Sequence, residues 1–283
     1  MIIDNHTLRM GLIGHPLGHS LSPLMHNRTL AHMGLNGIYL PMEITPLRLG
    51  EAVLGLRALN FTGVNVTIPY KQAVIPYLDE LSPEARACQA VNLIHHAEGR
   101  LIGYNTDGQG FMASLREEGI DRIDRVIIIG AGGAARAVVY ELAQAGTGRV
   151  DILDLLPERA AALAEFVNQA TPGTAVGHLM DQAVFAELCP AADLVVNCSP
   201  VGMHPGIDRS PVDSLAELNH NAVVYDLVYN PPVTRFLNLA RDRDILTING
   251  AAMLVHQGAL TLRILTGRQP PMAFMKEVIS HAI

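Results

Sequence analysis

Residues 126–137 read VIIIGAGGAARA, an apolar run that breaks into glycines and then continues as small helix-forming residues. This pattern predicts a strand, a tight turn and a helix. Gly130 suits the backbone angles of the turn, Gly132 leaves room for a phosphate because it has no Cβ, and Ala135 lets the helix pack closely on the strand. The amides that open the helix would then face the phosphates, and the cofactor-binding residues expected in this turn are Gly130, Ala131, Gly132, Gly133 and Ala134.

A second predicted strand, residues 149–155, follows at the spacing of a βαβ unit, and Asp154 lies at its end. In dinucleotide-binding folds, an acidic residue about twenty positions after the glycines accepts hydrogen bonds from the adenosine ribose. The alternative is an ordinary strand-to-helix turn whose glycines serve only packing. Because that alternative leaves the acidic residue unexplained, we favour a nucleotide site.

The composition of the chain limits what it can bind. Its 283 residues, 49% of them apolar, suffice for two modest cores, and its net charge of −7 is spread without the basic stripe that nucleic acids require. Three cysteines and twelve histidines show no metal-ligand spacing, so we expect neither disulfides nor a metal. No apolar run approaches the roughly 20 residues of a membrane span. We therefore expect a cytoplasmic protein with no membrane or nucleic-acid partner.

The beginning of the chain predicts a separate β/α unit. A short strand at 10–14 leads into a turn-rich loop and then a helix over residues 23–33. Ser22 before Pro23 is a good N-cap, whereas no cap requires Ser20. Two hydroxyls beside a helix N-terminus are also suited to bind a polyol or a carboxylate.

Further strands are predicted at 38–44 and 62–68, separated by an amphipathic helix over 46–59. Alternation along the second strand places Ile68 with its apolar face, and Asn65 and Thr67 on the polar face. Polar residues at the carboxyl end of a strand indicate a binding site. Lys71 follows directly, although a lone lysine is most often a solvated surface charge.

A hairpin is predicted from residues 90–95 and 100–104, closed through Glu98-Gly99, with Asn92 in its first strand. Asp107 then lies between glycines at the start of a helix. We expect Asp107 to be the N-cap of this helix, and it is also a candidate catalytic carboxylate.

Beyond the glycine motif, strands and helices alternate regularly, which predicts a doubly wound and mostly parallel sheet. The predicted elements are helices at 157–168 and 233–241 and strands at 193–197, 222–228 and 245–248. Leu227 and Tyr229 follow a strand end, where this architecture places ligands, and Gly250 precedes a long helix that ends at Thr266. Gln257 lies on an otherwise apolar stripe of this helix, where a polar residue is usually a hydrogen-bonded core residue.

Several ordered motifs together resemble the shikimate and quinate dehydrogenases from end to end. The motifs are Gly14-x-Pro16-x-x-His19-Ser20-x-Ser22-Pro23 with His26-Asn27, Asn65 to Lys71, Asn92 after Ala90-Val91, Gly103 to Gly108, and Gln257-Gly258. The resemblance implies an N-terminal α/β substrate-binding and catalytic domain at 1–107, completed by C-terminal helices at 252–283. It also implies a Rossmann NAD(P)-binding domain at 108–251, with a hinge near Gly108.

The resemblance implies a role for each matching residue. Ser20, Ser22 and Thr67 would bind the substrate carboxylate, and Asn92, Asp107 and Gln257 would hold the ring hydroxyls. Tyr229 would lie near the substrate, and Leu227 and Gly250 near the cofactor. Lys71 and Asp107 resemble the catalytic pair of the family. The implied reaction is reversible, NAD(P)-dependent hydride transfer at the 3-hydroxyl of shikimate, as in aromatic amino acid biosynthesis. Lys71 would accept the hydroxyl proton or, as a cation, stabilise the alkoxide.

The expected cofactor departs from the commonest pattern of the family, whose NADP-using members carry Asn-Arg-Thr after the second Rossmann strand. This chain has Asp154-Leu155-Leu156 there. A carboxylate accepts ribose hydroxyls and repels a 2′-phosphate, so we expect NAD to be preferred, while Arg159 leaves NADP open.

Three alternatives remain open at this point. The protein is a monomer or a homodimer, and its substrate is shikimate or, in quinate catabolism, quinate. A rival of another class is a Rossmann-type nucleotide sensor without chemistry, which would not need Lys71 beside Asp107.

Overall fold

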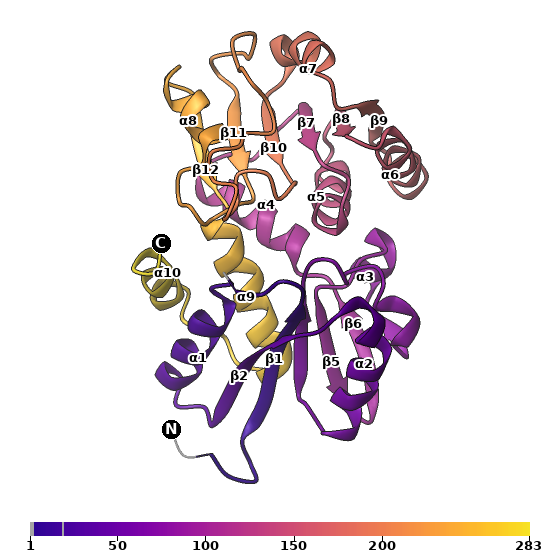
Figure 1. The fold of residues 1–283 in the computed structure, drawn as a ribbon, viewed down its shortest axis with the longest axis vertical. Coiled ribbons are helices and arrows are strands. Elements are labelled where there is room, and N and C mark those ends of the chain that lie inside the picture. The colour runs from indigo at the N-terminus through magenta and orange to yellow at the C-terminus, as the bar shows by residue number, and fades with distance from the viewer. Residues whose placement is uncertain (1–2, 19) are drawn as a thin grey trace. The chain divides into compact units, whose positions relative to one another are not determined.

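The computed structural model describes residues 3–18 and 20–283, so His19 of the first motif lies outside the described residues. Contacts within the chain divide it into two units. The first unit comprises Met1–Gly110 with Leu254–Ala282, and the second comprises Phe111–Met253 with Ile283. In Figure 1 the first unit runs from indigo to purple and returns in yellow, whereas the second runs from magenta to orange.

The second unit contains a six-stranded parallel sheet with the order β12-β11-β10-β7-β8-β9. Its strands are β7 (Arg125–Ile129), β8 (Arg149–Asp154), β9 (Thr174–Leu179), β10 (Leu194–Asn197), β11 (Val223–Asp226) and β12 (Leu246–Asn249). Its helices are α5 (Gly133–Gln144), α6 (Pro157–Ala170), α7 (Gln182–Leu188) and α8 (Arg235–Arg241). This order confirms the predicted doubly wound fold, and the strand order reverses between β7 and β10, where such folds bind ligands.

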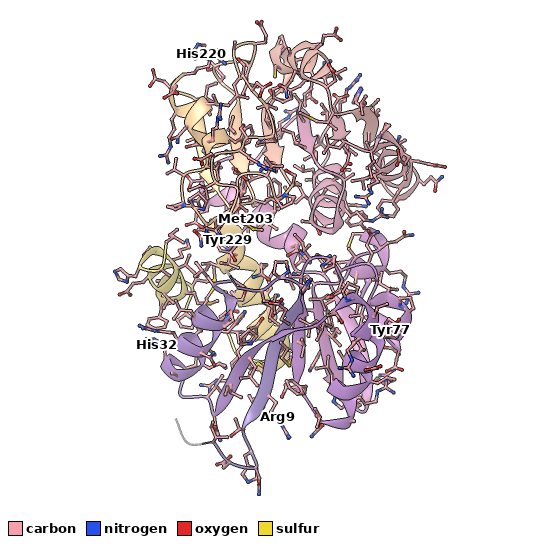
Figure 2. The ribbon with its side chains drawn as sticks, in the orientation of Figure 1. Arg9, His32, Tyr77, Met203, His220 and Tyr229 are labelled. Atoms are coloured by element: carbon pink, nitrogen blue, oxygen red, sulfur yellow. The ribbon has the colours of Figure 1, made fainter. Side chains whose placement is uncertain are left out.

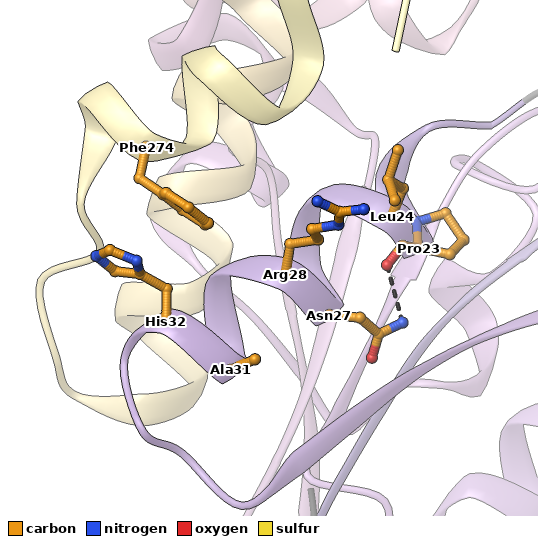
Figure 3. A pocket seen from close by; sticks show the side chains of 7 residues that line it. All are labelled: Pro23, Leu24, Asn27, Arg28, Ala31, His32 and Phe274. Carbon is orange, nitrogen blue, oxygen red and sulfur yellow. Dashed lines mark hydrogen bonds between the residues drawn. The ribbon is translucent and has the colours of Figure 1, made fainter. Parts of the chain in front are cut away.

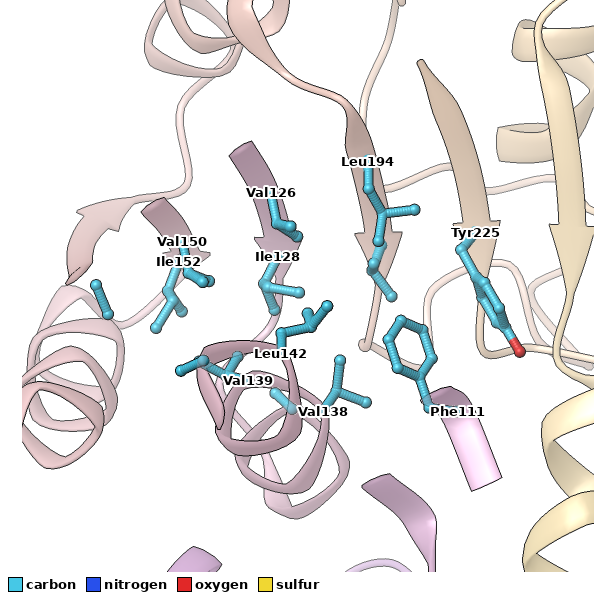
Figure 4. Packing of buried hydrophobic residues seen from close by; sticks show 14 of the residues in the cluster. Phe111, Val126, Ile128, Val138, Val139, Leu142, Val150, Ile152, Leu194 and Tyr225 are labelled. Carbon is cyan, nitrogen blue, oxygen red and sulfur yellow. The ribbon is translucent and has the colours of Figure 1, made fainter. Parts of the chain in front are cut away.

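The unbroken apolar run of β7 is explained by burial on both of its faces. Val126 and Ile128 point to one side, where they pack with Val138 of α5 in one core (Figure 4). Ile127 and Ile129 belong to a different core cluster. A parallel strand covered on both faces needs apolar residues at every position, which is why this stretch lacks polar alternation.

The first unit contains a mixed six-stranded sheet with the order β2-β1-β3-β5-β6-β4. Its strands are β1 (Leu8–Gly14), β2 (Gly37–Glu43), β3 (Gly63–Val66), β4 (Glu80–Leu81), β5 (Leu93–Ala97) and β6 (Arg100–Tyr104). Its helices are α1 (Ser22–His32), α2 (Leu49–Ala58), α3 (Pro83–Cys88) and α10 (Met272–Ser280), together with parts of α4 (Asp107–Glu117) and α9 (Ala251–Thr266). Because β1 pairs in parallel with both β2 and β3, the carboxyl ends of these three strands meet at one edge.

The two faces of β3 have different partners. Val64 and Val66 are buried in an apolar cluster, as alternation predicts. On the other face, a Cβ added to Gly63 would lie 2.3 Å from a methyl of Leu265, so α9 packs directly on the backbone. The prediction for Ile68 is wrong, because β3 ends at Val66 and the Ile68 side chain is 55% exposed.

Other local predictions also need correction. The helix predicted over residues 46–59 is a 3-10 turn (Pro46–Arg48) followed by α2. Strand β9 and helix α7 were not predicted, whereas α10 is one of the C-terminal helices expected over residues 252–283. Gly177 interrupts the apolar pattern of β9, yet a Cβ there would lie 2.5 Å from the Ala160 backbone, so the glycine permits close packing on α6. Among the described residues, no helix is long and apolar enough to cross a membrane.

Candidate active site

An ion pair joins Lys71 to Asp107 in the first unit. The Lys71 Nζ lies 2.5 Å from the Asp107 Oδ2, and the two side chains are 13% and 7% exposed. The backbone around Lys71 is held because Val91 N–H donates to the Lys71 carbonyl oxygen at 2.7 Å, and Tyr70 N–H donates to the Thr67 carbonyl oxygen at 2.9 Å. The sequence favoured a solvated lysine at this position, but the amine is mostly enclosed and paired with a carboxylate.

Asn92 binds the second oxygen of the same carboxylate. Its Nδ2 donates to Asp107 Oδ1 at 2.9 Å and to Thr106 Oγ1 at 2.8 Å, and its Oδ1 accepts from Thr106 N–H at 2.9 Å. The residue lies directly before β5, not within the strand as predicted. The expectation that Asp107 is an N-cap is wrong: α4 begins at Asp107 itself, and both carboxylate oxygens are bound to Lys71 and Asn92.

Gln257 on α9 lies close to the first turn of α4. A Cβ added to Gly110 would lie 2.9 Å from the Gln257 Cβ and backbone nitrogen, so the two helices approach so closely that only glycine fits. The Gln257 side chain is buried, and its Nε2 donates to the Leu254 carbonyl oxygen at 2.8 Å. Gly110 is less than one helical turn after Asp107, so this contact brings Gln257 near the ion pair.

The loop between β1 and α1, which carries Ser20, begins beside Thr67. Thr67 N–H donates to the Ile13 carbonyl oxygen at 2.9 Å, and a Cβ on Gly14 would lie 2.4 Å from the Thr67 methyl and 2.7 Å from the Leu17 side chain. Ser20 N–H donates to the Leu17 carbonyl oxygen at 3.0 Å. The predicted substrate residues of this loop and Thr67, which directly follows β3, therefore belong to one edge of the sheet.

The prediction that Ser22 is the N-cap of the first helix is wrong. Helix α1 begins at Ser22, and its N-cap residue is Leu21, which makes no side-chain cap. Instead, the Ser20 Oγ accepts from Ser22 N–H at 3.3 Å. The hydroxyl that stabilises the helix start is thus that of Ser20, not that of Ser22.

The turn of the second unit has the features that a dinucleotide needs. Gly130 has a φ of +99°, which favours glycine, and a Cβ there would also lie 3.2 Å from Ser199 N. A Cβ added to Gly132 would meet nothing within 4 Å, so the space beside this residue is open. The amides of Gly133 and Ala134 open α5 and have no acceptor within the helix. These residues fit a bound pyrophosphate.

Asp154 ends β8 and is held by two backbone amides. Its Oδ2 accepts from Ala131 N–H at 2.8 Å, and its Oδ1 accepts from Leu156 N–H at 2.9 Å. The amide of Ala131 is thus directed at Asp154, so a contact of Ala131 with the cofactor would be made by other atoms of the residue. Leu155 and Arg159 are exposed.

Leu227 and Gly250 lie together at the carboxyl ends of β11 and β12. A Cβ added to Gly250 would lie 2.0 Å from the Leu227 carbonyl oxygen, and Leu227 N–H donates to the Asn197 carbonyl oxygen at 3.0 Å. Tyr229 follows on the same loop of the second unit (Figure 2). The parallel sheet therefore gathers these three predicted residues at its ligand-binding edge.

The hydrogen-bond partners of two buried polar clusters were not predicted from the sequence. In the second unit, Asp226 accepts from Asn197 Nδ2 at 2.9 Å, from Thr234 Oγ1 at 2.6 Å and from Val228 N–H at 3.0 Å, and burial raises the pKa of this carboxyl to about 6. In the first unit, the Asn65 side chain is buried and fully hydrogen-bonded. The polar face of the strand at 62–68 marked Asn65 in the sequence, whereas Asp226 was marked only as a polar residue within an apolar strand.

A shallow hollow of about 650 Å³ lies between α1 and α10 (Figure 3). It is lined by Pro23, Leu24, Asn27, Arg28, Ala31, His32 and Phe274. None of these is a predicted site residue, so the hollow is not the candidate active site. Within residues 3–18 and 20–283, no group of three or more histidines, cysteines or acidic residues is arranged to hold a metal ion.

The chain was compared with protein families and known proteins. Residues 12–94 match the family model described as the shikimate dehydrogenase substrate binding domain, and residues 250–279 match the shikimate 5'-dehydrogenase C-terminal domain. A shikimate dehydrogenase (NADP(+)) of Syntrophomonas wolfei subsp. wolfei is 52% identical, over 100% of this chain and 98% of the relative.

Solved structures give the same result. Shikimate 5-dehydrogenase from Listeria monocytogenes, in complex with shikimate and NAD, is 35% identical with a TM-score of 0.90, over 98% of each chain. Quinate dehydrogenase from Corynebacterium glutamicum, in complex with NAD, is 33% identical with a TM-score of 0.88, over 97% of this chain and 99% of that one. The chain belongs to the shikimate dehydrogenase family of NAD(P)-dependent oxidoreductases.

Proposed function

We propose that the protein catalyses the reversible oxidation of the 3-hydroxyl of shikimate to the ketone of 3-dehydroshikimate, with a nicotinamide dinucleotide as the redox partner. The observation that carries this proposal is the cluster in which Lys71 and Asn92 hold the two oxygens of Asp107. The names of the Syntrophomonas relative and of the Listeria structure support shikimate as the substrate. A nucleotide sensor makes no use of this cluster.

Oxidation of an alcohol removes a hydride from carbon and a proton from oxygen. The nicotinamide, when bound, supplies the acceptor for the hydride. As a neutral amine, Lys71 Nζ would accept the hydroxyl proton and return it to oxygen in the reverse direction. As a cation, it would instead stabilise the alkoxide, whose proton passes to solvent. Asp107 keeps free lone pairs beyond its bonds to Lys71 and Asn92, so its carboxylate can also accept a bond from a ring hydroxyl.

We assign substrate binding and catalysis to residues 1–107 with 252–283, and dinucleotide binding to residues 108–251. The division of contacts after Gly110 and Met253 supports these bounds to within a few residues. The substrate carboxylate is bound by the hydroxyls at the edge of the first sheet, and the ring hydroxyls by the amides and by Asp107. The residues assigned to the carboxylate are Ser20, Ser22 and Thr67, and those assigned to the ring are Asn92, Asp107 and Gln257, with Tyr229 as a further substrate residue.

For the cofactor, we propose that NAD is preferred over NADP by at least about tenfold in kcat/KM, which corresponds to roughly 1.4 kcal/mol. The two amides that bind Asp154 fix its orientation, and each carboxylate oxygen keeps a lone pair for a ribose hydroxyl. A 2′-phosphate would meet this carboxylate as a like charge, and Leu155 offers no clamp. The name of the Syntrophomonas relative, which specifies NADP(+), points in the other direction, so this preference needs a direct test.

The test is a matrix of kcat/KM for shikimate and quinate, each with NAD and with NADP. We expect shikimate with NAD to give the highest value. The Corynebacterium relative makes quinate the specific alternative, which a higher value for quinate would establish. Higher values with NADP would refute the cofactor proposal and leave the reaction standing. Absence of turnover in all four combinations would refute the reaction itself.

A further inference from the structure

A row of buried hydrogen bonds leads from Tyr39 on β2 to the ion pair. The Tyr39 hydroxyl donates to the Asn65 Oδ1 at 2.8 Å, and the Asn65 Nδ2 donates to the Asn92 carbonyl oxygen at 3.0 Å. The Asn92 side chain in turn donates to Asp107 at 2.9 Å. All four residues are buried, and Tyr39 and Asp107, at the two ends of the row, are 68 positions apart in the sequence.

Asn65 is held in a single orientation by its three partners. Its amide hydrogens go to the Asn92 carbonyl oxygen and, at 3.1 Å, to the Thr261 Oγ1, and its oxygen accepts the Tyr39 hydroxyl. The amide group can rotate only by breaking these bonds. Because Asn65 binds the backbone of the residue whose side chain holds Asp107, its orientation bears on the carboxylate.

The ring of Tyr39 is itself fixed by a stacked neighbour. The rings of His26 and Tyr39 lie 4.3 Å apart with 18° between their planes. Within the described residues, neither ring nitrogen of the buried His26 has a hydrogen-bond partner, and burial lowers its pKa to about 3. The imidazole is therefore neutral near neutral pH, and its ring stacks on that of Tyr39.

We infer that Tyr39 is a positioning residue for the reaction, whose hydroxyl acts through Asn65 and Asn92 to hold the Asp107 carboxylate, and with it the Lys71 amine. The inference rests on the proposed function. Displacement of a reacting group by about 1 Å is sufficient to slow a reaction about 100-fold, and the loss of one bond two residues away should have a smaller effect. We expect Tyr39→Phe to slow hydride transfer by about tenfold.

The matched control is Tyr225→Phe in the second unit. Tyr225 is also a fully buried tyrosine, and its hydroxyl makes a side-chain hydrogen bond of the same 2.8 Å length, to Ser114. Each variant loses one buried hydroxyl, so each should lower the Tm by a similar amount. Only Tyr39→Phe should slow the chemistry, because the side-chain partner of the Tyr225 hydroxyl is Ser114, which lies seven positions after Asp107 on α4 and is not a member of the row.

The assay is the single-turnover rate of reduced nicotinamide formation at saturating shikimate, with unlabelled shikimate and with shikimate carrying deuterium at C3. For Tyr39→Phe we expect a rate about tenfold lower, a KM for shikimate within about twofold of the parent, and a steady-state isotope effect no smaller than that of the parent. For Tyr225→Phe we expect the parent's values. Parent turnover of shikimate tests the proposed function separately.

A Tyr39→Phe variant that folds and reacts at the parent's rate would overturn the inference. If that variant does not fold, Thr261→Val provides the second test, because it removes another partner of the same Asn65 side chain while nearly keeping the shape of the residue. Slower hydride transfer in Thr261→Val, with an unchanged KM, would support the role of the row. A parent rate in that variant would overturn it, and so would an equal slowing by Tyr225→Phe.

Discussion

His26 should make the first unit sensitive to mild acid. Burial lowers its pKa from 6.5 in the unfolded chain to about 3 in the folded protein, and no charged neighbour contributes to this shift. Between these values the unfolded chain binds a proton that the folded protein excludes, so the free energy of unfolding falls as the pH falls. This loss in the free energy of unfolding is absent well above pH 6.5 and grows until the pH reaches about 3. It amounts to about 1.4 kcal/mol between about pH 7.5 and about pH 5.5.

The perturbation is His26→Phe, which keeps a ring against Tyr39 and removes the titrating group together with two buried nitrogens that lack partners within the described residues. Asp226 has the opposite effect on stability. Because its pKa in the folded protein is raised to about 6, its contribution to the free energy of unfolding rises as the pH falls. The relevant quantity is therefore the difference between parent and variant at each pH, in which Asp226 cancels.

Urea unfolding followed by circular dichroism across this pH range would measure that difference. We expect the parent to lose about 1.4 kcal/mol more than His26→Phe on going from about pH 7.5 to about pH 5.5, whatever their stabilities at neutral pH. Parallel pH profiles for the two proteins would refute the reasoning. They would mean that the His26 imidazole binds a proton, or has a hydrogen-bond partner, within the folded unit.

Two further predictions concern ligand binding. Ser20→Ala should raise the KM for shikimate about tenfold or more, because a hydroxyl bonded to a charged carboxylate contributes about 1.5 to 3 kcal/mol, whereas an unchanged KM would remove Ser20 from the site. Since Ser20 also accepts from Ser22 N–H, the Tm of this variant is measured alongside. Paired Asp154→Asn and Leu155→Arg substitutions should shift the ratio of kcat/KM values toward NADP, and a ratio that does not move would contradict the role of Asp154.

The nucleotide-binding half of the fold could be read from the sequence because its signals are local. The run from Val126 to Ile129 marks a strand buried on both faces, and the glycines that follow fix the turn. Asp154 is found from its spacing alone. The same local reasoning missed β9, because Gly177 interrupts its apolar pattern. This glycine allows α6 to pack closely on the strand backbone.

The site of the first unit was only partly readable, because its geometry depends on distant parts of the chain. Asp107 has the sequence context of an N-cap, but Lys71, 36 residues earlier, competes for its carboxylate. The hydroxyl at the helix start belongs to Ser20 and not to Ser22, because the path of the loop, which sequence does not specify, decides which hydroxyl reaches an amide. The hydrogen bond between Asn65 and Thr261 joins residues 196 positions apart, so no local sequence pattern predicts it.

The most direct test of the catalytic claim is the rate of shikimate oxidation by Lys71→Ala. The chain contains one other lysine, Lys276 on α10, so Lys276→Ala is a control for the loss of an amine elsewhere. We expect the parent and Lys276→Ala to reduce the nicotinamide at similar rates, and Lys71→Ala to be slower by at least about 100-fold with nearly unchanged affinity for shikimate. A Lys71→Ala protein that oxidises shikimate at the parent's rate would contradict the account.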